Sequence, residues 1–175
     1  MKLRQTTGVK LVSKAFNRIR ISWKAVPGCN RYAIYRWDER GNSKKMATVT
    51  ADVVTWQDTA VKTGSTYTYR IRASYVRSGK NTVYGAASSP LSAKAELGKA
   101  RAVAKAVSGP CNRVSWKKVS GASGYYIYRK LQGKSWVRIG TVNNKVLSWQ
   151  DTEIEGITSY AYAVRPYKNV DGKKF

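Results

Sequence analysis

The segments Tyr32-Ala33-Ile34-Tyr35-Arg36 and Tyr125-Tyr126-Ile127-Tyr128-Arg129 are two copies of one pattern, 93 residues apart. The same offset relates Ile21-Ser22-Trp23-Lys24 to Val114-Ser115-Trp116-Lys117, Trp56-Gln57-Asp58-Thr59 to Trp149-Gln150-Asp151-Thr152, and Tyr67-Thr68-Tyr69-Arg70-Ile71-Arg72 to Tyr160-Ala161-Tyr162-Ala163-Val164-Arg165. A constant offset indicates a tandem repeat. Because the repeat is longer than a solenoid unit and long enough for its own core, we predict two like domains, residues 1–97 and 98–175.

Apolar and polar residues alternate inside the repeated motifs. In Ile19-x-Ile21-x-Trp23 and Tyr67-x-Tyr69-x-Ile71-x-Ala73 the period is two, which is typical of strands with one buried face. Turn clusters such as Lys62-Thr63-Gly64-Ser65 and Ser120-Gly121-Ala122-Ser123-Gly124 separate these segments. Short strands with frequent turns predict an all-β chain in which each copy is an antiparallel sandwich.

The markers occur in the same order in both copies. They are a strand ending in Ser-Trp-Lys, a Val-x-Gly-x-x-x-Tyr turn, the strand Tyr-x-Ile-Tyr-Arg, a Trp-Gln-Asp-Thr corner, and Tyr-x-Tyr-x-Ile/Val-Arg. With these markers each copy resembles a fibronectin type III domain of the bacterial secreted and cell-surface type. The resemblance implies two tandem immunoglobulin-like sandwiches, with Trp23 and Trp116 in their cores and Tyr67 and Tyr160 as corner tyrosines that bond to upstream backbone.

The two copies differ at their ends. The first continues through residues 83–95, which should form its last strand, whereas the second stops at Phe175, which aligns with Thr82. We therefore expect the second domain to lack its last strand and its sixth strand, residues 159–168, to have an unpaired edge. Truncation of a longer chain and an edge left open by design would both give this pattern.

The composition is strongly basic. The chain has 33 Lys and Arg against 9 Asp and Glu, a net charge of +24, with 18 basic and 5 acidic residues up to Leu97 and 15 and 4 after it. The positive electrostatic field of such a charge favours anionic partners, including nucleic acid, acidic wall polymers, sulfated glycans and membrane surfaces. No stretch approaches the length of a membrane span, and no signal peptide is visible. An extracellular or cell-surface location is implied by the resemblance alone.

Residues suited to catalysis are scarce. The chain has no histidine, the most usual general base and zinc ligand. Asp58 and Asp151 occupy one repeat position and are expected to fix a corner by bonding nearby backbone. Cys29 and Cys111 fall at non-equivalent positions, so neither domain can hold an internal disulfide. We expect no enzyme activity, no cofactor and no metal.

The outward face of the third and sixth strands is the candidate binding surface. The expected ligand-binding residues are Tyr35, Trp37, Arg70 and Arg72 in the first copy and Tyr126, Tyr128, Arg165 and Trp136 in the second. Aromatic rings beside guanidinium groups can stack on sugars or bases and hold a carboxylate, sulfate or phosphate. The same pairs can instead stabilise the sheet, because the arginine stem packs over the ring.

The sequence thus predicts a non-catalytic spacer or adhesion module of a bacterial extracellular or cell-surface protein. Its expected partners are an acidic polysaccharide or cell-wall polymer and other domains of a longer chain. The alternative is a basic cytosolic module that binds nucleic acid or assembles by strand exchange. Nucleic acid is the less favoured partner, because the charge is spread over several faces and no nucleic-acid motif appears.

Overall fold

The computed structural model describes residues 2–77, 81–155 and 159–175, and all regular structure within them is β-strand. The chain divides into two compact units, residues 1–96 and 97–175, here named domain one and domain two. The division falls one residue before the boundary expected from the repeat. The reason is packing, since Leu97 lies against the core of domain two.

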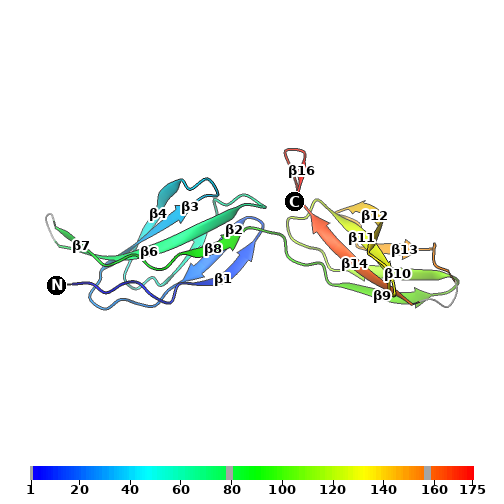
Figure 1. Ribbon diagram of the computed structural model, residues 1–175, viewed down its shortest axis with the longest axis horizontal. Coiled ribbons are helices and arrows are strands. Elements are labelled where there is room, and N and C mark those ends of the chain that lie inside the picture. Colours follow the sequence, from blue (N-terminus) through cyan, green and yellow to red (C-terminus); the bar gives the residue numbers. More distant parts are fainter. Residues whose placement is uncertain (1, 78–80, 156–158) are drawn as a thin grey trace. The chain divides into compact units, whose positions relative to one another are not determined.

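Domain one is a sandwich of two antiparallel sheets (Figure 1). One sheet has the order β1-β2-β5 and consists of Lys10–Ala15, Arg18–Ser22 and Thr55–Asp58. The other has the order β4-β3-β6-β7, with β8 also paired to β6, and consists of Ser43–Thr50, Arg31–Trp37, Thr66–Val76, Thr82–Tyr84 and Leu91–Lys94.

The core of domain one follows the alternation in the sequence. Along β6 the side chains of Tyr67, Tyr69, Ile71 and Ala73 are buried. Trp23 meets them from the other sheet, with only 5% of its surface exposed. Period-two burial of this kind fixes the register, because a slip of one residue would turn every apolar side chain to solvent.

The expected last strand of domain one is two short strands. β7 pairs with the end of β6 and β8 with its beginning, so the prediction of one strand over residues 83–95 is wrong in this respect. Between them the backbone N–H groups of Gly85 and Ser88 donate to the carbonyls of Ala73 and Ile71. Pro90, just before β8, has no backbone N–H and therefore cannot donate a hydrogen bond to a continuous ladder.

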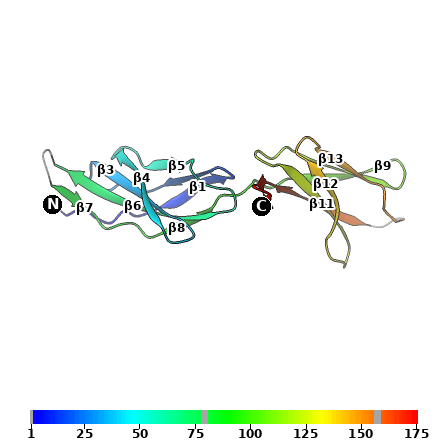
Figure 2. The ribbon, with the colours of Figure 1, turned by 90° about the horizontal axis from the view of Figure 1, so that it is seen from above.

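Domain two repeats the sandwich with fewer strands (Figure 2). Its sheets have the orders β13-β10-β9, formed by Ser148–Asp151, Cys111–Trp116 and Ala102–Val107, and β12-β11-β14, formed by Val137–Asn143, Gly124–Leu131 and Tyr160–Tyr167. A hairpin of β15, Asn169–Val170, and β16, Lys173–Lys174, follows. Its turn residues Asp171 and Gly172 have φ values of 50° and 79°, as a two-residue type I′ hairpin turn requires.

The sixth strand of domain two has a free outer edge. Among the described residues β14 pairs only with β11, whereas its counterpart β6 pairs with β3, β7 and β8. In the described part of the chain, no counterpart of β8 lies along β14. One detail of the prediction is wrong, because Lys168 at the end of the expected open edge exchanges backbone hydrogen bonds with Phe175.

Candidate functional site

Asp58 lies at the centre of a buried polar network in domain one. Its Oδ2 accepts hydrogen bonds from Arg36 Nη1 at 2.8 Å and from the Tyr69 hydroxyl at 2.9 Å. Its Oδ1 accepts from the backbone N–H of Ala60, so the expected corner contact is present. The arginine and the tyrosine are partners that the sequence reasoning missed, although both recur at the repeat offset.

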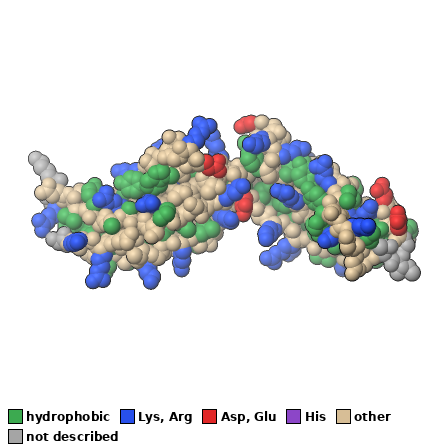
Figure 3. Space-filling model, viewed as in Figure 1, with side chains coloured by type: hydrophobic (Ala, Val, Ile, Leu, Met, Phe, Trp, Pro, Cys, Tyr) green, Lys and Arg blue, Asp and Glu red, His purple; other side chains and the backbone are tan. Residues whose placement is uncertain are grey.

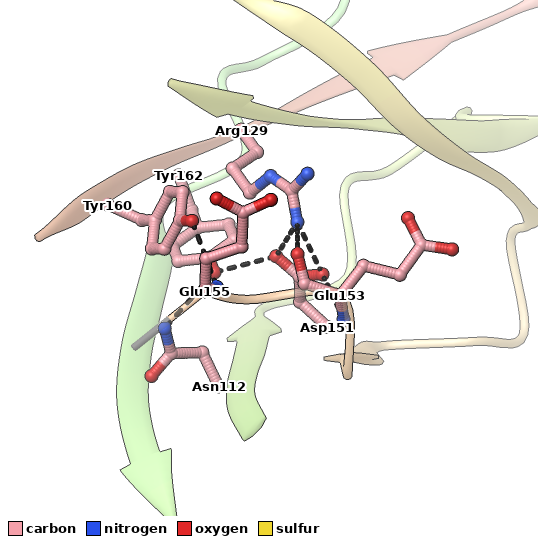
Figure 4. A network of polar contacts seen from close by, with 7 residues as sticks. All are labelled: Asn112, Arg129, Asp151, Glu153, Glu155, Tyr160 and Tyr162. Atoms are coloured by element: carbon pink, nitrogen blue, oxygen red, sulfur yellow. Dashed lines mark hydrogen bonds and ion pairs between the residues drawn. The ribbon is translucent and has the colours of Figure 1, made fainter. Parts of the chain in front are cut away.

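Domain two builds the same network around Asp151 (Figure 4). Arg129 Nη1 lies 3.0 Å from Asp151 Oδ1, and the Tyr162 hydroxyl donates to Oδ2 at 2.7 Å. Burial, followed by the hydrogen bond to Asp151, raises the pKa of Tyr162 to about 12. A buried carboxylate satisfied by an arginine and a tyrosine in both copies has a structural role, since its lone pairs are already engaged.

The corner tyrosines and core tryptophans also recur. The backbone N–H of Lys62 donates to the Tyr67 hydroxyl at 3.0 Å, and that of Glu155 donates to the Tyr160 hydroxyl at 3.1 Å. Trp23 and Trp116 are 5% and 6% exposed. These side chains hold the fold and leave the outward sheet faces as the candidate site.

On domain one the candidate residues form two separate groups. Tyr35 lies opposite Arg70 in the ladder, and its ring centroid is 6.4 Å from that of Trp37. Arg72 turns toward another partner, because its guanidinium lies 4.4 Å from the centroid of Tyr84 and its Nε donates to the carbonyl of Gly85. Arg72 is thus engaged in holding the segment after β7.

On domain two Tyr126 stacks on Tyr167. The ring centroids are 4.6 Å apart and the planes are 26° from parallel, while Arg165 lies opposite Tyr126 in the ladder. Gly124 makes this stacking possible, because a Cβ at that position would lie 2.5 Å from the Tyr167 hydroxyl oxygen. Any other residue would press on the ring and, closer still, on the backbone carbonyl of Val142 in β12.

Cations surround the stacked rings. The Arg138 guanidinium lies 5.1 Å from the Tyr126 centroid, and Lys174 Nζ lies 5.1 Å from that of Tyr167 and 5.9 Å from that of Tyr126. We name this surface the Tyr126–Tyr167 patch, consisting of Tyr126, Tyr167, Arg138, Arg165 and Lys174. Ion pairs within the described ranges involve Lys14, Arg36 and Arg129, so no carboxylate there neutralises the three patch cations.

Tyr128 and Trp136 lie outside the patch. Tyr128 faces Ala163 and Arg138 across the ladder, and in the described part of the chain no ring contact joins it to Tyr126 or Tyr167. Trp136 is 48% exposed between β11 and β12, where Lys130 Nζ lies 6.0 Å from its ring. The structure therefore brings together only two of the four residues expected on this domain.

Tyr167, Arg138 and Lys174 were missed from the sequence. Their counterparts in the first copy are Ser74, Lys45 and Asn81. The sequence does contain a feature that could have identified Tyr167. An aromatic residue present in only one of the two copies is not required by the fold that both copies share. The matching change from Arg31 to Gly124 marks the position that makes room for the ring.

Other features do not suggest a site. Within the described ranges no group of acidic or cysteine side chains is arranged to hold a metal, and no helix there is long and apolar enough to cross a membrane. Both cysteines are free. A hollow of about 460 Å³ on domain one is lined by both charge signs, including Arg36, Glu39 and Lys62, and so favours no class of ligand by charge.

Comparison with known proteins identifies the fold. No protein-family model and no curated protein matches the sequence. A two-domain fibronectin type III segment of chicken tenascin matches with a TM-score of 0.54 at 12% identity, covering 97% of this chain and 95% of that one. The FN1–FN3 domains of chicken CNTN1 match at 16% identity with a TM-score of 0.40, covering 95% of this chain and 63% of that one. The tenascin likeness shows a tandem fibronectin type III fold, and the predicted fold class is confirmed.

Proposed function

We propose that this chain is a non-catalytic adhesion and spacer module of a bacterial extracellular or cell-surface protein, and that it binds acidic polysaccharide or cell-wall polymer. The observation that supports binding is the Tyr126–Tyr167 patch, where Arg138 and Lys174 lie over a stacked pair of rings and Arg165 is opposite Tyr126 in the ladder. Among the described residues, none of these three cations has a carboxylate partner. Tandem sandwiches suit the spacer role.

The chemistry of the patch favours an anionic group carried on a ring or chain. Arg138 presents a planar guanidinium that can hold a carboxylate, sulfate or phosphate through two hydrogen bonds, and Lys174 adds a point charge. Both cations are held over tyrosine rings, which reduces the conformational freedom lost on binding. An anionic polymer would supply the negative charge that these cations lack as a partner.

The rest of the surface adds long-range attraction. Figure 3 shows Lys and Arg side chains spread over both domains, with few acidic side chains on the face in view. A net charge of +24 raises the local concentration of a polyanion and its association rate. This attraction is screened by salt, so on its own it gives no site preference.

Matched charge variants test the proposal. The variant R138Q/R165Q/K174Q removes three cations from the patch, and K105Q/K117Q/K118Q removes three exposed cations elsewhere on domain two. Both are compared with the unmodified chain for retention on heparin and on a teichoic-type phosphate polymer. We expect the patch variant to elute at clearly lower salt on at least one matrix, because it loses positioned contacts as well as charge.

Two outcomes would contradict the proposal. Equal losses for the two variants would mean that net charge alone causes retention. Stronger retention of the unmodified chain on single-stranded DNA than on either polymer, at the same salt, would favour the nucleic-acid alternative, since stacked aromatics among cations also bind bases and phosphates. Circular dichroism of both variants shows whether the fold is intact.

A further inference from the structure

The two rings of the Tyr126–Tyr167 patch already have partners within the protein. Their centroids are 4.6 Å apart, so each ring stacks on the other. In addition, the Arg138 guanidinium lies over the Tyr126 ring and Lys174 Nζ lies over the Tyr167 ring, each 5.1 Å from the centroid. A sugar ring that stacked on either tyrosine would therefore have to compete with a neighbouring ring or a cation.

The exposure of the patch side chains points the same way. Arg138, Arg165 and Lys174 are exposed, whereas Tyr126 and Tyr167 are half-buried. A ligand that approaches from solvent meets the cations first. The rings hold two of these cations in place, and a side chain that is already held loses less conformational freedom when it binds an anion.

The cations lie on both sides of the Tyr126 ring. Arg138 belongs to β12 and Arg165 to β14, and these two strands flank β11, which carries Tyr126. Neighbouring strands are about 4.8 Å apart, so about 10 Å separates β12 from β14. Lys174 reaches Tyr167 from the hairpin that follows β14. A chain with several anionic groups can contact both sides at once, whereas a single small anion contacts one.

Domain one lacks this arrangement at the matched positions. Ala33 and Ser74 replace the two tyrosines of the patch. Arg72, which matches Arg165, is engaged within its own domain, because its guanidinium packs on Tyr84 and its Nε donates to a backbone carbonyl. A row of exposed cations on both sides of a stacked ring pair is therefore a feature that distinguishes domain two.

We propose that the Tyr126–Tyr167 patch recognises a linear polyanion through its charged groups, at two or more points across the strands, without stacking on a sugar ring. This inference rests on the proposed binding function of the patch and narrows its ligand. The ligand is a chain that carries phosphate or sulfate groups on successive units, which guanidinium and ammonium groups bind directly. A chain of phosphates without any sugar has the chemistry that the patch requires.

Competition among anions of different length is the direct test. A labelled heparin-type oligosaccharide is bound to the full chain and followed by fluorescence anisotropy at constant ionic strength. Inorganic phosphate, pyrophosphate and long-chain inorganic polyphosphate are then added as competitors. We expect polyphosphate to displace the oligosaccharide at a total phosphate concentration on the order of 100-fold lower than the single phosphate requires, because contacts made by one chain act at a high effective concentration.

Matched variants separate positioned contacts from net charge. The ratio between the phosphate and polyphosphate concentrations that give half displacement should fall at least about tenfold in R138Q/R165Q/K174Q, because the multipoint contact is lost. It should stay close to that of the unmodified chain in K105Q/K117Q/K118Q, which has the same net charge as the patch variant. An equal fall in both variants would overturn the proposal.

A neutral oligosaccharide tests ring stacking. Maltohexaose has several sugar rings and no charge, so it should neither displace the labelled oligosaccharide nor shift the ring signals of Tyr126 and Tyr167 in nuclear magnetic resonance spectra. Saturable shifts of those signals would show that the rings bind sugars, and would overturn the proposal.

Two further results would overturn the proposal and leave the proposed function intact. The first is an oligosaccharide that binds the patch and is not displaced by polyphosphate, which would mean that the sugar is required. The second is displacement by phosphate and polyphosphate at the same total phosphate concentration, which would indicate a site for one anion. If the labelled oligosaccharide bound R138Q/R165Q/K174Q and K105Q/K117Q/K118Q equally well, the proposed function itself would fail.

Discussion

Asp58 and Tyr167 illustrate the two kinds of residue that a tandem repeat contains. Asp58 recurs as Asp151, and in both copies the carboxylate is buried and bonded to an arginine and a tyrosine. Tyr167 replaces Ser74 of the first copy and stacks on Tyr126 at the surface of the sheet. The shared position serves the sandwich, and the unshared one is available for binding.

The Tyr162 hydroxyl should make domain two sensitive to alkaline pH. Its pKa is raised to about 12 by burial and by Asp151, whereas an unfolded tyrosine ionises near pH 10. The raised pKa of Tyr162 contributes to the free energy of unfolding. This contribution is complete below about pH 10, where Tyr162 is protonated in both the folded and the unfolded state. It is lost as the pH rises toward 12, because the unfolded state releases its proton first. Thermal melts between pH 9 and 12 should show this loss.

The variant Tyr162→Phe provides the control for that prediction. It lacks the ionisable hydroxyl, so its melting temperature should fall less steeply over the same pH range, even though lysines also titrate there. An equal slope for the variant and the unmodified chain would mean that Tyr162 ionises at its ordinary pKa in the folded domain.

The Tyr167→Ser variant should weaken polymer binding without changing the charge. Serine is the residue at this position in domain one, so the backbone geometry tolerates it. The loss of the ring removes a contact of Lys174 and the stacking partner of Tyr126. We expect earlier elution from the acidic matrix than for Tyr128→Ser, a tyrosine outside the patch. Equal elution of the two variants would show that the ring pair has no part in binding.

At the scale of strands, the sequence predicts most of the sandwich and misses its interruptions. Alternation places Tyr69 and Ile71 inside and Arg70 outside, because that pattern records burial along one strand. The break between β7 and β8 depends on bonds from Gly85 and Ser88 to distant residues of β6. Contacts of that kind leave no periodic trace in the sequence.

The candidate site shows the same limit. Alternation and pairing place Tyr126 and Arg165 on one face, and the structure agrees. The stacking of Tyr167 depends on the space left by Gly124, and Lys174 arrives through the hairpin turn at Asp171 and Gly172. Such placements come from tertiary geometry, which period-two reasoning does not contain.

Two tryptophans test the assignment of strand faces. Trp23→Ala should cost about 3–5 kcal/mol of the unfolding free energy of domain one, as expected for a large buried ring. Trp37 is half-buried on the outward face of β3, beside Tyr35, so Trp37→Ala should cost far less. Urea denaturation followed by far-ultraviolet circular dichroism measures both values. If the two losses were the same, the inward and outward faces of β3 would be wrongly assigned.

At the scale of the whole molecule, the two domains have nearly equal charge and unequal surfaces. Domain one carries 18 basic and 5 acidic residues up to Leu97, and the remainder of the chain carries 15 and 4. A partner attracted by net charge alone would therefore bind both domains. Preference for domain two has to come from the Tyr126–Tyr167 patch, whose counterparts in domain one include Ala33 and Ser74.

The most direct measurement is a titration of the full chain with a short, homogeneous heparin-type oligosaccharide, followed by nuclear magnetic resonance of side chains and amides. The proposal predicts saturable shifts at Tyr126, Tyr167 and Arg138. Smaller shifts are expected at Ser74 and Lys45, which occupy the repeat positions of Tyr167 and Arg138 in domain one. Shifts of equal size at the matched positions of both domains, or shifts that vanish at physiological salt, would contradict a binding site on domain two.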